Sequence, residues 1–99
     1  MDYRVILSLP ALRDLGKIAR YIAQDNPDAA LRVGNELVAL SESLALLPRR
    51  GGVFRGRPGV RRLVSAPYLV NYRIDETQRV IYVLRFWHTR RDPKDWRPE

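Results

Sequence analysis

The C-terminal third of the chain constrains its fold most strongly, because two runs of alternating side chains lie between Pro67 and Pro93. Apolar or aromatic residues occupy every second position of each run: Tyr68, Val70, Tyr72 and Ile74, then Val80, Tyr82, Leu84 and Phe86. A period of two in such residues is typical of half-buried β-strands. The polar residues 75–78 between the runs are short enough for a hairpin loop. The pattern therefore predicts two antiparallel strands, the second of which ends in a basic tip at residues 87–91.

The first part of the chain predicts a strand followed by an amphipathic helix. Apolar side chains alternate with other residues from Tyr3 to Leu7, as in a strand. Ser8 is a favourable N-cap, and Pro10 lies where a first helical turn tolerates proline. The core face of this helix consists of residues spaced by three or four, namely Leu12, Leu15, Ile18, Ala19 and Ile22. Asp14, Lys17 and Arg20 fall outside that face.

A second helix is predicted to begin after Asn26, which can cap it, with Pro27 in its first turn. Its apolar seam has 3-4-3-4-3 spacing and is expected to end at Pro48; the seam residues are Ala30, Val33, Leu37, Leu40, Leu44 and Leu47. Such a seam favours packing against the first helix as a helical hairpin. A narrower stripe of Leu31, Val38 and Ala45 indicates either burial on two sides or a groove for a partner helix.

Residues 49–59 have the composition of a loop, with four glycines and four arginines and only Val53-Phe54 to anchor it. Residues 60–65 return to strand character before Ala66-Pro67. The predicted fold is α+β: an N-terminal strand, a helical hairpin, and then a three-stranded antiparallel meander. Residues 1–99 are expected to form a single domain, because a chain of this length cannot build two independent cores.

Positive charge is concentrated in the second half of the chain. The formal net charge of the whole chain is +7, but it is −1 through Leu47 and +8 from Pro48 onward. Arginine supplies 16 of the 18 basic residues, and its planar guanidinium suits bidentate contacts with phosphate or carboxylate. This asymmetry indicates an acidic or polyanionic partner on one side of the molecule.

Several kinds of chemistry are disfavoured by what the sequence lacks. It contains no cysteine and one histidine, so no metal site is expected, and the glycine-rich loop lacks the spacing of a phosphate loop. The serines have no triad context, and no cofactor is predicted. With no apolar run of the roughly 18–20 residues that cross a bilayer, a cytoplasmic protein is expected.

The chain resembles the ParE branch of the RelE/ParE toxin superfamily from Val5 to Pro93. The resemblance is carried by four stretches in combination: LSLPALRDLGKIARYIAQDNPDAALRV, LALLPRRG, GVRRLVSAPYLVNYRID and VIYVLRFWHTRRDP. It implies the toxin of a bacterial type II toxin–antitoxin pair, bound by a ParD-like antitoxin in a hetero-oligomer. Family members usually carry proline directly after the serine at Ser8, whereas here Leu9 intervenes.

The resemblance also implies a choice between two targets. RelE-like members cleave mRNA on the ribosome without a metal, and typically carry an arginine where this chain has Leu69 and a tyrosine near the C-terminus, where none follows Tyr82. ParE-like members inhibit DNA gyrase and have no established nuclease activity. The sequence therefore favours a non-enzymatic gyrase inhibitor. The alternative is a ribosome-dependent mRNA endonuclease that uses His88 and Arg85, and a binding module without toxicity is a third hypothesis.

Two sets of contact residues are predicted on this basis. Gyrase is expected to contact the basic loop and the C-terminal tip, through Arg90, Arg91 and Trp96 with support from Arg55 and Arg57. The antitoxin is expected to lay apolar side chains along Tyr21, Leu31 and Val38. Its acidic residues would meet the arginines of the second half.

Overall fold

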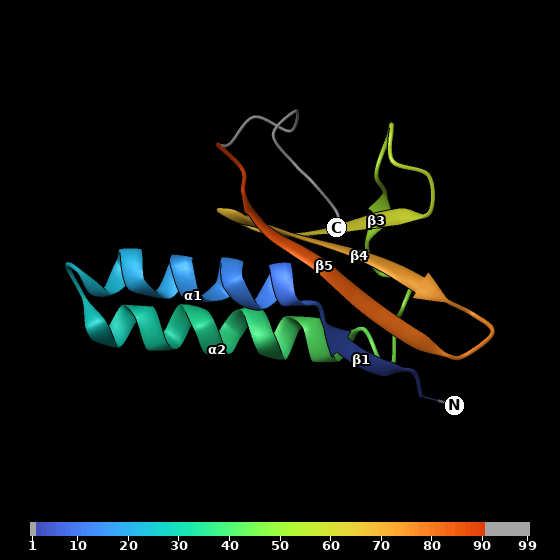
Figure 1. The fold of residues 1–99 in the computed structure, drawn as a ribbon, viewed down its shortest axis with the longest axis horizontal. Coiled ribbons are helices and arrows are strands. Elements are labelled where there is room, and N and C mark those ends of the chain that lie inside the picture. The colour runs from blue at the N-terminus through green and yellow to red at the C-terminus, as the bar shows by residue number, and fades with distance from the viewer. Residues whose placement is uncertain (1, 91–99) are drawn as a thin grey trace.

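The computed structural model describes residues 2–90, which form a five-stranded sheet with two helices on one of its faces (Figure 1). In chain order the elements are β1 (Arg4–Leu7), α1 (Leu9–Ala23), α2 (Pro27–Ser43), β2 (Gly52–Val53), β3 (Val60–Ser65), β4 (Tyr68–Asp75) and β5 (Val80–His88). The strand order is β1-β5-β4-β3-β2, with β1 parallel to β5 and every other pair antiparallel. The predicted α+β order and the meander of β3, β4 and β5 are confirmed. Neither described helix is long and apolar enough to cross a bilayer.

Both helices begin at the predicted caps. The Ser8 hydroxyl accepts a hydrogen bond from the backbone N–H of Ala11 at 3.2 Å, and it donates to the carbonyl of Leu84 at 3.0 Å. The Asn26 side chain accepts from the N–H of Ala29 at 3.0 Å. These bonds satisfy N–H groups that a helix leaves unpaired at its start. The Ser8 cap also joins the start of α1 directly to β5.

The predicted end of the second helix is wrong by about one turn, because α2 ends at Ser43 and not at Pro48. The hydroxyls of Ser41 and Ser43 donate to the carbonyls of Leu37 and Leu40, which compete with the helical pattern. At residues 44–46 each backbone N–H then donates to the carbonyl three residues earlier, in place of the carbonyl four residues earlier as in an α-helix. The Ala45 carbonyl accepts from the N–H of Tyr3, so the chain leaves the helix to meet the N-terminal strand.

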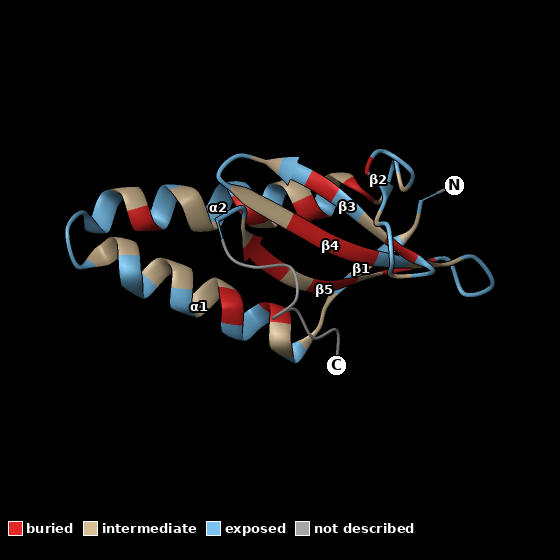
Figure 2. Cartoon of the chain, turned by 90° about the horizontal axis from the view of Figure 1, so that it is seen from above, coloured by how far each residue is buried: buried red, intermediate tan, exposed pale blue. Residues whose placement is uncertain are grey.

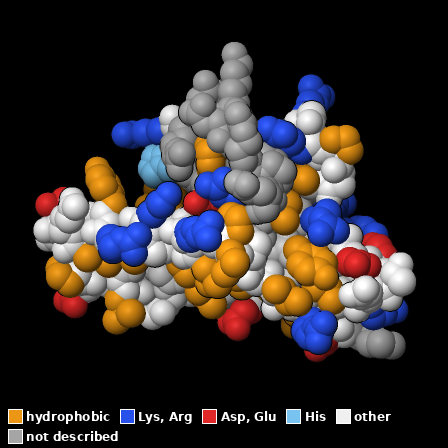
Figure 3. Space-filling model, viewed as in Figure 1, with side chains coloured by type: hydrophobic (Ala, Val, Ile, Leu, Met, Phe, Trp, Pro, Cys, Tyr) orange, Lys and Arg blue, Asp and Glu red, His pale blue; other side chains and the backbone are white. Residues whose placement is uncertain are grey.

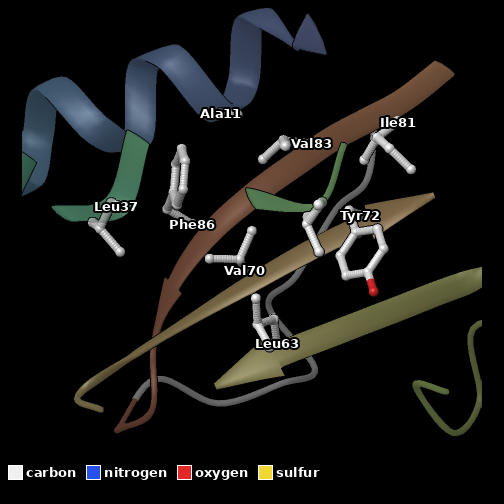
Figure 4. Packing of buried hydrophobic residues seen from close by; sticks show 9 residues of the cluster. Ala11, Leu37, Leu63, Val70, Tyr72, Ile81, Val83 and Phe86 are labelled. Atoms are coloured by element: carbon white, nitrogen blue, oxygen red, sulfur yellow. The ribbon is translucent and has the colours of Figure 1, made fainter. Parts of the chain in front are cut away.

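The main core lies between the helices and the sheet (Figure 4). Its buried side chains come from α1, the end of α2 and the three long strands: Ala11, Leu37, Leu44, Leu63, Val70, Tyr72, Ile81, Val83 and Phe86. Along β5 buried residues come in pairs, separated by partly buried ones, and residues 70–72 in the middle of β4 are all buried (Figure 2). The expectation of a strand buried on one face is therefore wrong for β5.

A β-bulge causes this departure from simple alternation. Asn71 pairs with Arg85 and its neighbour Tyr72 pairs with Val83, so Leu84 is the extra residue on β5. A bulge reverses the facing of the residues that follow it. Leu84 accordingly packs on the sheet face away from the helices, whereas Phe86 packs into the main core.

Tyr72 fixes the loop that follows α2. Its hydroxyl donates to the carbonyl of Pro48 at 2.7 Å and accepts from the N–H of Gly51 at 2.9 Å. A Cβ at Gly51 would lie 2.7 Å from the carbonyl oxygen of Arg62, so the close approach of the loop to β3 requires glycine. Burial raises the pKa of Tyr72, and the neutral phenol is the form that donates this bond.

We expect Tyr72→Phe to lower the free energy of unfolding by about 1–3 kcal/mol, because it leaves the buried N–H of Gly51 without an acceptor. Urea denaturation followed by circular dichroism measures the change. Tyr82→Phe is the matched control, since Tyr82 is only partly buried and lies on the other sheet face. Equal, small effects of the two substitutions would contradict the role assigned to the Tyr72 hydroxyl.

Candidate interaction surfaces

A buried ion pair joins α1 to β5. The guanidinium of Arg85 donates from Nε to Oδ2 of Asp14 at 2.6 Å and from a terminal nitrogen to Oδ1 at 2.8 Å. The backbone N–H of Phe86 donates to the same carboxylate at 3.1 Å. Asp14 is 5% exposed, so its expected position outside the core face of the helix is corrected. The cause is its partner on β5, which the periodicity of α1 cannot reveal.

His88, the candidate base of the alternative enzymatic hypothesis, has one ring nitrogen occupied. Nδ1 accepts from the backbone N–H of Arg90 at 3.1 Å, so a neutral ring carries its proton on Nε2. The ring also packs edge-on against Tyr68, with 5.4 Å between the ring centroids. Arg85, the other residue of that hypothesis, is held by Asp14 and does not line the pocket at His88.

The pocket at His88, which we call the wedge, has a volume of about 410 Å³ and opens between α1 and the far end of the sheet. Figure 1 shows the C-terminal end of β5 rising away from α1 at this place. The wedge is lined from α1 by Asp14, Lys17, Ile18 and Tyr21, and from the sheet by Tyr68, Phe86 and His88. Burial, and secondarily the neighbouring Tyr21, raises the pKa of Tyr68.

A second concavity, which we call the groove, lies between α1 and α2 on their outer side and has a volume of about 610 Å³. Small residues line much of it: Gly16, Ala19, Ala23, Ala30 and Gly34. Leu31 and Val38, two predicted antitoxin contacts, meet here, and Leu31 is 67% exposed. The third, Tyr21, is 74% exposed but lies across α1 in the wedge.

The sheet face away from the helices combines arginines with aromatic rings. A small cluster of Val60, Leu84 and Trp87 is buried there, with Phe54, Leu69 and Tyr82 packed around it. Three arginines make cation–π contacts with aromatic rings. The distances from the guanidinium carbon to the ring centroid are 5.0 Å for Arg62 over Phe54, 4.9 Å for Arg73 over Tyr82 and 5.2 Å for Arg85 over Trp87. The pairs of Arg62 with Phe54 and of Arg73 with Tyr82 join separate segments of the chain, so periodicity within one strand does not reveal this surface.

The predicted gyrase contacts occupy two separate places. Arg55 and Arg57 lie in the loop between β2 and β3, where Gly56 and Gly59 both adopt a φ of +78°. Arg90 is exposed just beyond β5. Arg91 and Trp96 lie outside the described residues. Figure 3 shows Lys and Arg side chains both along the helices and at the sheet end of the viewed face.

An exposed network holds the β4–β5 loop against the loop after α2. The Tyr3 hydroxyl and the Arg49 guanidinium both donate to the Glu76 carboxylate. The Tyr3 hydrogen bond, and after it Arg49, lowers the pKa of Glu76, while the same bond raises the pKa of Tyr3.

Among residues 2–90, no group of three His, Cys, Asp or Glu side chains is placed to hold a metal ion.

These features define a class of small, basic α+β protein with recessed surfaces on both sides of its first helix. The family described as "ParE toxin of type II toxin-antitoxin system, parDE" matches residues 5–93. The chain therefore belongs to the ParE toxin family, within the RelE/ParE superfamily of type II toxin–antitoxin systems.

Relatives and solved structures agree with this assignment. The chain is 38% identical to Y4kP of Sinorhizobium fredii over 82% of this chain and 85% of that protein. It is 31% identical to toxin RelE1 of Caulobacter vibrioides over 89% of this chain and 95% of that protein. Its fold is similar to the toxin–antitoxin complex RelBE2 of Mycobacterium tuberculosis, with a TM-score of 0.69 and 26% identity over 89% of this chain and 99% of that chain. The chromosomal ParDE system of P. aeruginosa has a TM-score of 0.73 at 23% identity, over 87% and 95% of the two chains.

We expect Asp14→Ala to lower the free energy of unfolding by about 3–5 kcal/mol, because it removes the buried carboxylate that accepts from the Arg85 guanidinium and from the Phe86 N–H. Asp25→Ala, at an exposed position after α1, should change it by less than about 0.5 kcal/mol. Urea denaturation measures both. The double variant Asp14→Leu/Arg85→Met should be more stable than Asp14→Ala, and a double variant of equal or lower stability would contradict the ion-pair explanation.

Proposed function

We propose that this type II toxin arrests growth by binding DNA gyrase in the cytoplasm, and that a ParD-like antitoxin neutralises it. The observation that carries the proposal is the engagement of Arg85 by Asp14. A phosphate at Arg85 would have to displace the Asp14 carboxylate, which is unfavourable because it leaves that buried carboxylate without its ion-pair partner. A toxin whose central arginine is committed in this way is better suited to gripping a macromolecule than to phosphodiester chemistry.

Two further observations support binding over catalysis. Leu69, at the place where RelE-like members are expected to carry an arginine, packs with the apolar cluster on the open sheet face. His88 uses Nδ1 to accept a backbone N–H, which is a structural role. Metal-independent RNA cleavage needs preorganised positive charge together with a proton-transfer group at one phosphate. In support of binding, Arg85 is paired with Asp14 and does not line the pocket at His88.

Purified toxin is expected to inhibit supercoiling by DNA gyrase and to trap cleaved plasmid. Arg90→Ala, and the pair Arg55→Ala/Arg57→Ala, should weaken this inhibition, because they remove positive charge from the proposed contact regions; Arg90 and Arg55 are exposed and Arg57 is partly exposed. Arg32→Ala is the matched control, since Arg32 lies on α2 in an exposed pair with Glu36. If the toxin arrests growth but leaves gyrase activity unchanged, the proposal that gyrase is its target is wrong. Codon-positioned mRNA cuts that vanish in His88→Ala would instead establish the endonuclease alternative.

The antitoxin is proposed to place an amphipathic helix in the groove. The groove is apolar, lies between two helices and is open to solvent along Leu31 and Val38, which suits the apolar face of a third helix. The small residues of its walls allow a close approach of backbones. Acidic residues elsewhere on the antitoxin would complement the net charge of +7.

Val38→Asp should weaken the toxin–antitoxin complex by about tenfold or more, because the new carboxylate would be buried against an apolar helix face. Ala39→Asp is the matched control, since it adds the same charge at the next, exposed position outside the groove. Titration calorimetry with the antitoxin encoded by the neighbouring reading frame gives both affinities. Equal weakening by the two variants would argue for general charge repulsion and against occupation of the groove.

A further inference from the structure

We infer that the wedge is a second anchoring site for the antitoxin, and that it accepts a carboxylate-bearing side chain together with its apolar stem. The inference rests on the proposed antitoxin function but concerns a different side of α1 from the groove. It is carried by the chemistry of the groups that line the wedge.

The wedge forms because β5 extends beyond the end of β1, its neighbour at the edge of the sheet. β1 ends at Leu7, whose partner is Val83, so the rest of that edge of β5 faces α1. Asp14 closes the inner end by binding Arg85 and the N–H of Phe86. Beyond this closure the C-terminal end of β5 rises away from α1 (Figure 1). The wedge is the pocket of about 410 Å³ at this place.

The polar groups that remain available in the wedge are chiefly hydrogen-bond donors. Lys17 carries an ammonium group, and the neutral His88 ring has its proton on Nε2 because Nδ1 accepts from Arg90. Tyr68 and Tyr21 add phenolic hydroxyls, and the raised pKa of Tyr68 keeps its proton in place. Of the described lining residues, Asp14 alone carries a negative charge, and three hydrogen bonds already occupy its carboxylate. A ligand that satisfies these donors must bring an acceptor-rich, anionic group.

The walls of the wedge favour a carboxylate on a side chain over a phosphate. Ile18, Phe86 and the two tyrosine rings present an apolar surface for a methylene stem or a ring. Among residues 2–90, Lys17 is the only Lys or Arg that lines the wedge. Phosphate sites usually draw on arginine forks or several cations, so this single ammonium matches the single charge of Asp or Glu better.

The wedge and the groove lie on opposite sides of α1. At 100° per residue, the groove residues Leu12, Gly16 and Ala19 and the wedge residues Lys17 and Tyr21 face roughly opposite directions. A helix is about 10–12 Å thick with its side chains, and an extended chain covers about 3.3 Å per residue. A linker of about four to six residues therefore suffices to join a helix in the groove to an acidic residue in the wedge. Two linked contacts raise the affinity through effective concentration.

The test compares Lys17→Ala with Arg13→Ala in the full-length toxin. Arg13 lies one turn before Lys17, is exposed and lines neither the wedge nor the groove, so both variants lose one positive charge from the same helix. Calorimetry with the neighbouring antitoxin, at about 0.05 and 0.3 M salt, should show about tenfold weaker binding for Lys17→Ala at low salt and less than about twofold for Arg13→Ala. Tyr68→Phe, which keeps the ring, should weaken binding by about threefold.

The outcomes distinguish failure of the wedge as an antitoxin anchor from failure of the proposed binding of an antitoxin. Equal effects of Lys17→Ala and Arg13→Ala would overturn the wedge as an anchor, while weakening by Val38→Asp alone would leave the proposed antitoxin function intact. A wild-type toxin that does not bind the antitoxin would refute both. As a further check, NMR shifts of the His88 and Tyr68 rings on addition of inorganic phosphate or adenosine monophosphate, but not of antitoxin, would reassign the wedge to a phosphate ligand.

Discussion

The contact between Asp14 and β5 determines how the two layers of the molecule meet. β1 is only four residues long, so most of the edge of β5 has no strand beside it. One carboxylate on α1 takes the place of that missing strand, because it accepts the N–H of Phe86 and pairs with Arg85. An unpaired edge N–H and a buried guanidinium would each be costly alone. The position of α1 on the sheet, and with it the place of both concavities, follows from this contact.

The same contact separates the charges of the protein into two groups. Arg85 is neutralised in the interior, whereas Arg55, Arg90 and the stacked Arg62 and Arg73 remain at loops and on the open sheet face. Positive charge at the periphery speeds encounter with acidic partners and depends on ionic strength. The net charge thus bears on association and partner choice, and contributes little to the stability of the fold.

Features that depend on neighbours in the sequence could be predicted, and those that depend on distant partners could not. The caps at Ser8 and Asn26 and the meander follow from local residue types and alternation. The burial of Asp14 could not be predicted, because its partner is 71 residues away. The bulge at Leu84 likewise arises from the register between β4 and β5, which alternation within one strand does not encode.

The candidate site was predictable to a similar degree. Leu31 and Val38 share a helical stripe, so their meeting in the groove follows from their spacing on one helix. Tyr21, the third predicted antitoxin contact, lies on a different side of α1 and lines the wedge with Tyr68 and His88. No periodicity within α1 could reveal that pocket, since three of its seven lining residues come from the far end of the sheet.

The rigidity of the joint between α1 and β5 bears on how an antitoxin in the groove would neutralise the toxin. The groove lies on the outer side of the helices, whereas Arg55 and Arg57 lie in the β2–β3 loop and Arg90 lies beyond β5. A change transmitted through the core would have to disturb the Asp14 pair, at about 3–5 kcal/mol, and typical coupling energies between sites are about 1–3 kcal/mol. Direct coverage is therefore favoured over transmission. An antitoxin chain that continues from the groove around α1 to the wedge arrives beside His88, two residues before Arg90.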